Sequence, residues 1–181
     1  MKQGVYGLQS FKMQAAVPNS FPTSWTSAQT INAIVKDSLS FNDSESSDND
    51  IEVEDLADFY ASLPSTLATK GFTVQTYDLS PEMFQYLCGY ALSDGYYVEN
   101  PNFQLVNQAV QIVTKAFGEF PSKTFEWANM VCKVTRSGTI GKSGFPNFNI
   151  TFKQQSLIDS TGKAIGGARF KLTEASGSHE Q

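Results

Sequence analysis

Apolar and polar residues alternate in several short stretches of the chain, and a period of two predicts β-strands that bury one face. The clearest stretches are GFTVQTYDL (71–79), KTFEWANMVCKVTR (123–136) and NFNITFKQQS (147–156). Shorter strands are expected near 5–11, 31–41, 96–99, 108–117 and 168–172. Turn residues separate these stretches at intervals of roughly ten residues, a spacing typical of antiparallel sandwiches and barrels.

Three of the predicted strands have distinguishing features. In 31–41, Asp37 interrupts a face that is otherwise apolar and consists of Ile31, Ala33, Val35, Leu39 and Phe41. Apolar spacing between 104 and 117 also fits a helix, but the β-branched residues of Val110–Thr114 favour a strand over 108–117. The long strand 123–136 is expected to contain a bulge near Asn129.

One segment predicts a helix rather than a strand. Ser80 is a suitable N-cap, Pro81 suits the first helical position, and Glu82 suits the positive N-terminus of a helix. Gly89 can end the helix in a left-handed conformation. The apolar residues between these signals follow helical spacing and are Met83, Phe84, Leu87 and Cys88. So short a helix is not stable alone, so we expect its apolar face to pack on a sheet.

These elements predict a mainly β fold, an antiparallel sandwich or barrel with one short flanking α-helix and a long acidic loop. The length of 181 residues suits one domain. We expect this domain over 31–175, an extended N-terminal arm over 1–30, and a flexible tail over 176–181. The sequence has no long apolar run for a membrane span and no apolar signal-peptide core, so neither a membrane partner nor export is expected.

The acidic loop, residues 42–70, changes this picture most. Residues 37–58 contain nine acids and no base, whereas the rest of the chain has nine acids and 13 bases. Blocks of like charge resist compact folding, which favours an exposed loop. Apolar residues are interspersed among the acids, so the loop is a candidate subunit interface. The candidate residues are Asp43, Glu45, Asp48, Asp50, Ile51, Val53, Leu56 and Phe59.

The sequence offers no catalytic constellation and predicts no enzyme, catalytic residue or cofactor. The one histidine, His179, is two residues from the end, where no fixed group can position it as a base. Cys88 and Cys132 are expected to be buried thiols rather than a disulfide. The acids of Asp43–Glu54 partly match a calcium loop, but Asp48 occupies the position that requires glycine. Weak binding of a divalent cation by these carboxylates is the alternative to the absence of a metal site.

Two further patterns have structural interpretations that we prefer. GTIGKS (138–143) lacks the first glycine of a phosphate loop, because Arg136 stands there, so a surface turn is expected. Tyr96, Tyr97 and Trp127 could stack on sugars, but core packing is the expected fate of Trp127. The negative net charge gives no support to general nucleic-acid binding, which needs a dense basic face.

The order of these elements resembles the tail tube (major tail) proteins of tailed bacteriophages. A strand leads into an acidic loop (SLSFNDSESSDNDIEVEDLADF), followed by a strand and short helix (GFTVQTYDLSPEMFQYLCG), then VQIVTKAFGEFPSKTFEWANMVCKVT and FNITFKQQSLIDSTGKAIGG. The resemblance covers roughly residues 31–172. Tube proteins of type VI secretion systems and contractile bacteriocins share this architecture and are the related alternative.

The resemblance implies a structural virion protein. Six subunits would form a ring, and rings would stack into a tube through which DNA passes without specific binding. Residues 42–70 would correspond to the loop that reaches neighbouring subunits or the next ring. The implied partners are further copies of the chain and other tail proteins such as sheath, tape measure or terminator. The implied location is the virion tail, after assembly in the cytoplasm of a host bacterium. A carbohydrate- or receptor-binding β-sandwich is the alternative from a different class.

Overall fold

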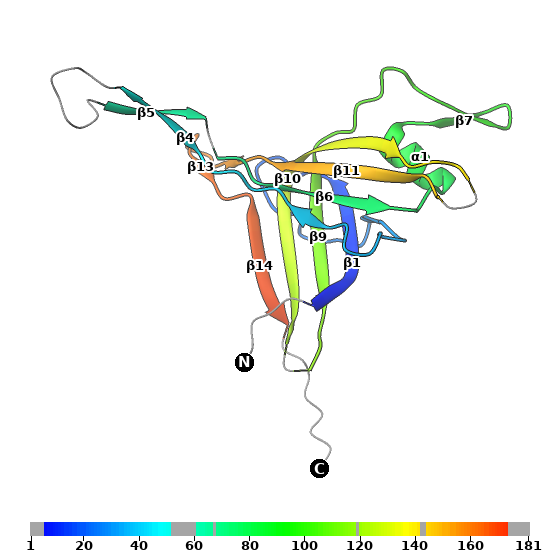
Figure 1. Cartoon of the computed structure of the whole chain (residues 1–181), viewed down its shortest axis with the longest axis horizontal. Coiled ribbons are helices and arrows are strands. Elements are labelled where there is room, and N and C mark those ends of the chain that lie inside the picture. The colour runs from blue at the N-terminus through cyan, green and yellow to red at the C-terminus, as the bar shows by residue number, and fades with distance from the viewer. Residues whose placement is uncertain (1–5, 52–60, 67, 119, 142–143, 174–181) are drawn as a thin grey trace, which may run out of the picture.

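The computed structural model describes residues 6–51, 61–66, 68–118, 120–141 and 144–173. These residues form antiparallel β-sheets and one α-helix, which confirms the predicted fold class (Figure 1). In chain order the elements are β1 (Tyr6–Ala15), β2 (Gln29–Thr30), β3 (Ser40–Phe41), β4 (Ser47–Ile51), β5 (Ala61–Thr66), β6 (Gly71–Thr76), α1 (Pro81–Cys88), β7 (Ala91–Ser93), β8 (Tyr96–Val98), β9 (Gln108–Lys115), β10 (Ser122–Ser137), β11 (Asn147–Gln154), β12 (Leu157–Ile158), β13 (Ala164–Ile165) and β14 (Ala168–Thr173).

The main sheet has two parts that share the long strand β10. Its order is β2-β1-β9-β10-β11-β6-β3, and β14 pairs with the first half of β10. The first half of β10 therefore belongs to a four-stranded part, β1-β9-β10-β14, and the second half pairs with β11. The register between β10 and β9 shifts between Trp127 and Met130, which confirms the predicted bulge near Asn129. Figure 1 shows the two parts crossing at a steep angle.

The core fills the space between these two parts. Rings of Phe72 and Phe152 stack with centroids 4.7 Å apart, and Phe11 and Trp127 pack beside them. Trp127 is 8% exposed, as expected for a core residue. Burial of apolar area at about 25 cal/mol per Å² is the main stabilising term. The buried apolar cluster consists of Phe11, Met13, Ile31, Phe72, Val74, Met83, Leu87, Val110, Ile112, Trp127, Met130, Cys132, Phe148, Ile150 and Phe152.

Helix α1 has the caps that its sequence predicts. The Ser80 hydroxyl accepts a hydrogen bond from the Met83 amide at 3.4 Å, and Gly89 ends the helix with φ 69°. Met83 and Leu87 are buried in the core cluster, and Phe84 packs edge-on against Phe148 with ring centroids 5.0 Å apart. The helix therefore covers the sheet with its predicted face.

The prediction of a half-buried strand over 31–41 is wrong. Only Ser40–Phe41 forms a strand there, and Ile34 makes an isolated bridge to Thr76. Ala33 (φ 47°) and Asp37 (φ 58°) adopt left-handed backbone conformations, which end any extended run. Ile31 is buried all the same, so the apolar pattern here reflects an irregular segment lying on the core.

The N-terminal segment does not behave as an extended arm over Tyr6–Ala15. These residues form β1, which pairs along its length with β9 and contributes Phe11 and Met13 to the core. Its alternation was obscured by two register irregularities, between Tyr6 and Leu8 and between Leu8 and Ser10. The predicted strand near 5–11 thus extends further and lies inside the sheet.

The acidic loop contains a β-hairpin. Strands β4 and β5 pair from Ser47↔Thr66 to Ile51↔Ala61 and project away from the body in Figure 1. A second hairpin, β7 and β8, turns at Asp94 and Gly95 and projects at the other side of the molecule. Both lie outside the eight-stranded sheet, so their strand pairs are stabilised locally rather than by the core.

Candidate assembly surfaces

The first candidate surface is the acidic hairpin, which we define as the paired strands β4 and β5. Ser44 and Thr69 anchor its base through two backbone hydrogen bonds of 2.8 and 3.2 Å and a hydroxyl pair at 2.6 Å. Asp43 accepts a hydrogen bond from the Gly71 amide at 3.2 Å, which ties the base to β6. These contacts fix where the hairpin leaves the sheet.

The structure places some of the predicted interface residues and not others. Asp43 and Glu45 are exposed at the base of the hairpin. Asp48, Asp50 and Ile51 belong to β4. The predicted contributions of Val53, Leu56 and Phe59 lie outside the described residues.

The second candidate surface is formed by the outer edges of the four-stranded part of the sheet. Within the described residues, β14 pairs with β10 on one side and has no strand partner on the other. At the opposite side, β2 pairs with β1 at Lys12 and Met13 only, so among these residues the outer edge of the first half of β1, away from β9, has no strand partner. Strand edges present unpaired N–H and C=O groups and readily pair with another chain.

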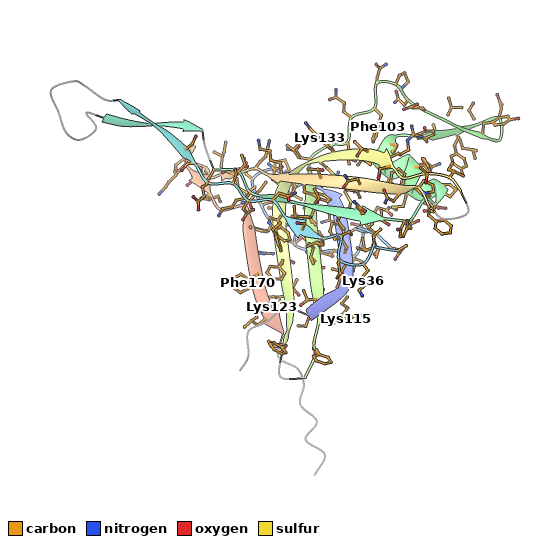
Figure 2. The ribbon with its side chains drawn as sticks, in the orientation of Figure 1. Lys36, Phe103, Lys115, Lys123, Lys133 and Phe170 are labelled. Carbon is orange, nitrogen blue, oxygen red and sulfur yellow. The ribbon has the colours of Figure 1, made fainter. Side chains whose placement is uncertain are left out.

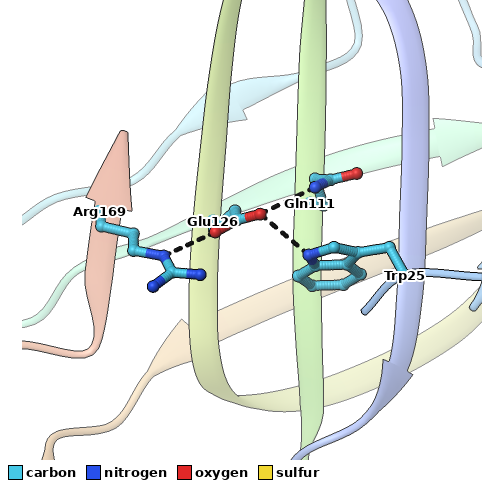
Figure 3. Close-up of polar contacts among 4 residues, drawn as sticks. All are labelled: Trp25, Gln111, Glu126 and Arg169. Carbon is cyan, nitrogen blue, oxygen red and sulfur yellow. Dashed lines mark hydrogen bonds and ion pairs between the residues drawn. The ribbon is translucent and has the colours of Figure 1, made fainter. Parts of the chain in front are cut away.

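A polar network holds the edge strand β14 in place (Figure 3). Glu126 of β10 is 8% exposed, and its Oε2 accepts a hydrogen bond from Arg169 Nε of β14 at 2.6 Å. Its Oε1 accepts from Trp25 Nε1 at 2.9 Å and from Gln111 Nε2 of β9 at 2.8 Å. The guanidinium of Arg169 also lies over the Phe21 ring, 4.2 Å from its centroid. Because one carboxylate joins two strands and the segment before β2, the network fixes their relative positions.

The pKa of Glu126 reflects these contacts. Burial alone would raise the pKa, but hydrogen bonds from Gln111, Arg169 and Trp25 and the charge of Arg169 outweigh it, so the pKa lies below its ordinary value. The carboxylate is therefore ionised at neutral pH. Sequence patterns could not reveal this network, because its hydrogen-bonded partners are separated by up to 101 residues and their pairing depends on the fold.

A third candidate surface is apolar and lies beside β14. Phe170 is 67% exposed and Leu172 is 41% exposed, and the Phe170 ring lies 6.1 Å from that of Phe125. Phe125 stacks in turn near Trp127, so the exposed residues continue the aromatic core outward. A neighbouring groove of about 850 Å³ runs between β1 and the segment 30–39, with Leu8, Phe11 and Phe41 among its lining residues. An apolar surface that extends from the core to solvent indicates a contact site.

The described residues contain no group of three or more His, Cys, Asp or Glu side chains placed to hold a metal ion. Cys88 and Cys132 are free thiols, and burial raises the pKa of Cys132 to about 12, so this thiol stays protonated and unreactive. Residues 138–141 of the predicted surface turn are exposed and lie outside the named helix and strands, whereas residues 142–143 and His179 lie outside the described residues.

No helix in the described part of the chain has the length and apolar character needed to cross a bilayer. Comparison with known proteins finds no matching family and no matching curated sequence.

Proposed function

We propose that this chain is a structural subunit that self-assembles into hexameric rings, which stack as a tail tube that conducts phage DNA. The observation that carries the proposal is the pair of open edges on the four-stranded part of the sheet, β14 at one side and the first half of β1 at the other. Pairing of β14 from one copy with β1 of the next extends the sheet from subunit to subunit. Because two different edges meet, the contact is head-to-tail, and it closes into a ring when six such rotations complete one turn.

The exposed apolar side chains support assembly as well. Phe170 and Leu172 extend the core to the surface beside β14, where a neighbouring subunit would cover them. The two hairpins, β4–β5 and β7–β8, project from opposite sides of the body and offer contacts beyond those of the sheet edges (Figure 1). In such a particle the partners are copies of the chain and other tail proteins, and the location is the virion tail.

Electron microscopy of the purified protein tests this proposal directly. Rings or tubes of uniform diameter, together with a sedimentation profile that shifts to large species with concentration, are the expected results. A protein that stays monomeric at all concentrations up to roughly millimolar, where even weak contacts of this kind form, would overturn it.

One observation favours a second function, a carbohydrate-binding module. Tyr96 is 76% exposed and Tyr97 is 43% exposed on the β7–β8 hairpin, where aromatic rings are available for stacking on sugars. Glycan-array binding that is lost in Tyr96→Ala, in a protein that forms no rings, would support this function instead of the tube.

A further inference from the structure

One apolar row of side chains crosses all four strands of the four-stranded part of the sheet. The directly opposite pairs, from β1 through β9 and β10 to β14, are Phe11–Ile112, Ile112–Phe125 and Phe125–Phe170. Residues directly opposite one another in antiparallel strands point to the same face of the sheet. Phe11 and Ile112 belong to the buried core, so we call the face of this row the inner face. Phe170 is the end of an inner-face row.

Strand β14 completes this face with two exposed apolar side chains. Successive residues of a strand point to opposite faces, so Leu172 shares the inner face with Phe170, whereas Lys171 between them lies on the outer face. Phe170 is 67% exposed and Leu172 is 41% exposed, and no described strand pairs with the outer edge of β14. Figure 2 shows Phe170 on β14 at one side of the sheet and Lys36 beside β1 at the other. The β14 edge therefore offers apolar side chains that no neighbouring strand covers.

The opposite edge, at β1, has a groove instead. Leu8 lies opposite Thr114 of β9, on the inner face, and lines the groove of about 850 Å³ between β1 and residues 30–39. Ile34 and Leu39 line the same groove from the other segment, so its surface is largely apolar. The edge strand itself contributes further lining residues, which are Gly7, Gln9 and Ser10. The groove therefore reaches the part of β1 whose outer edge is open.

Only a short part of the β1 edge can accept another strand. Strand β2 pairs with Lys12 and Met13, and the Ile31 amide donates a hydrogen bond of 2.9 Å to the Phe11 carbonyl. An added strand therefore pairs with residues 7–10, where Leu8 is the inner-face residue. The direction of the strands alternates from β1 to β14, so β14 of a copy that joins in the same orientation runs antiparallel to β1.

We propose that the groove between β1 and residues 30–39 is the receptor for Phe170 and Leu172 of a second copy of this chain. The inference rests on the proposed function, in which β14 of one copy pairs with β1 of the next, and it identifies the side chains that this contact buries. A sheet keeps its faces when a strand is added, so Phe170 and Leu172 of the arriving β14 lie on the inner face beside Leu8. There they enter the groove and continue the apolar row from copy to copy.

Pairing at the sheet edge selects β14 as the occupant of the groove. The exposed apolar residues of the β7–β8 hairpin, such as Leu92 and Tyr96, lie on strands outside the eight-stranded sheet, so edge pairing does not direct them to the groove. Phe41 is also exposed, but it lines the groove of its own copy. When a strand is added to a sheet edge, backbone hydrogen bonds supply affinity and side-chain pockets supply specificity. The groove is the pocket that such an addition requires.

Engineered cysteine pairs test whether β14 of one copy lies at the groove of another. Leu8→Cys is combined with Leu172→Cys or with Phe170→Cys, since either residue of β14 can face Leu8. Within one copy, β1 and β14 are three strand spacings apart, roughly 14 Å, which is too far for a disulfide, so any bond joins two copies. The matched control is Leu8→Cys with Lys171→Cys, which places the second thiol on the outer face of the same strand.

Mild oxidation of assembled protein, followed by denaturing electrophoresis without reductant, reads out the linkage. At least one inner-face pair is expected to give a ladder of linked species up to the hexamer, because each disulfide joins successive copies. The control pair is expected to give no ladder, because its thiols lie on opposite faces of the sheet. Variants with a single added cysteine measure the background from the native thiols, Cys88 and Cys132.

A second pair of variants measures how much the buried side chain contributes to assembly. Phe170→Thr should raise the protein concentration needed for ring formation by roughly tenfold or more, because a phenylalanine side chain is then missing from an apolar site. Lys171→Thr, on the outer face, should leave that concentration nearly unchanged. Urea unfolding of dilute protein checks that both variants are folded, as expected for residues that are exposed in the free chain.

The outcomes separate this inference from the proposed function. If the unmodified protein forms no rings or tubes, the proposed function itself fails. If rings form but neither inner-face cysteine pair links copies beyond the single-cysteine background, the groove is not the receptor and the tube proposal stands. The inference is also overturned if the control pair links as strongly as the inner-face pairs, or if Phe170→Thr and Lys171→Thr assemble at the same concentration.

Discussion

The guanidinium Nε of Arg169 lies 2.6 Å from the carboxylate Oε2 of Glu126, and this contact joins the edge strand β14 to the long strand β10. Trp25 and Gln111 complete the set of donors around the carboxylate. A strand at the edge of a sheet is held on one side only, so side-chain contacts of this kind determine how firmly it is fixed. In the tube that we propose, the same strand carries the contact with the next subunit.

Arg169→Met should destabilise the monomer by about 1–3 kcal/mol, because hydrogen bonds to charged groups contribute on that scale. The change also removes the contact with the Phe21 ring. Lys171→Met, at an exposed position two residues further along β14, is the matched control and should change the free energy of unfolding by less than about 0.5 kcal/mol. Urea unfolding of dilute protein measures both values. Equal effects of the two substitutions would show that the network does not stabilise β14.

The titration of Glu126 predicts how the free energy of unfolding depends on pH in the acid range. Its pKa in the folded protein is lower than the ordinary value of 4.5, so the folded state favours the ionised form. This contribution is fully present above pH 4.5 and is lost as the pH falls through the lowered folded pKa, where the carboxylate takes up a proton. Glu126→Gln should therefore lose less stability than the unmodified protein between neutral and strongly acidic pH. Parallel stability curves for the two proteins would contradict the assigned pKa direction.

Leu87→Ala should cost about 2–5 kcal/mol of stability, because Leu87 is 3% exposed and belongs to the core cluster. Gln85→Ala, on the exposed side of the same helix, controls for changes in helix propensity and should be nearly neutral. The two free energies come from chemical denaturation. A loss at Leu87 no larger than that at Gln85 would mean that α1 does not pack as described.

Alanine substitutions at two glycines distinguish the free-energy cost of a strained backbone from the cost of a steric overlap. Gly89 (φ 69°) and Gly95 (φ 82°) both have left-handed conformations, so alanine is disfavoured at either position by about 1 kcal/mol. A Cβ at Gly95 meets no atom within 4 Å, whereas a Cβ at Gly89 overlaps the Phe103 ring. Gly89→Ala should therefore destabilise the protein clearly more than Gly95→Ala. Thermal or urea unfolding of both variants provides the comparison, and equal losses would show that Phe103 moves aside freely.

Local signals predicted part of this fold well. Helix α1 was predictable because Ser80, Pro81 and Gly89 act on backbone groups only a few positions away in the chain. The bulge of β10 followed from a change in alternation near Asn129. By contrast, Ile31–Phe41 has the alternation of a strand, but the exposed residues Ala33 and Asp37 adopt left-handed conformations that interrupt the extended backbone and that the alternation does not reveal.

The candidate surfaces were predictable only in part. The acidic loop was predicted from charge, because the eight acids of residues 43–66, with no base among them, stand out in any sequence, but the pairing of β4 with β5 within it was not predicted. The network around Glu126 also escaped prediction, because its members are far apart in the chain and meet only through the fold.

The acidic hairpin should be dispensable for folding and necessary for assembly. Ser44 and Thr69 form a hydrogen-bonded antiparallel pair at its base, so replacing residues 45–68 by Asn-Gly closes the chain with a two-residue turn. The hairpin lies outside the eight-stranded sheet, and therefore the shortened protein should keep the stability of the core. It should nevertheless form no stacked tubes in electron micrographs. In hydrogen exchange, the amides of β4 should be better protected in assembled than in free protein. Tubes formed by the shortened chain, or equal protection of β4 in both states, would show that the hairpin takes no part in assembly.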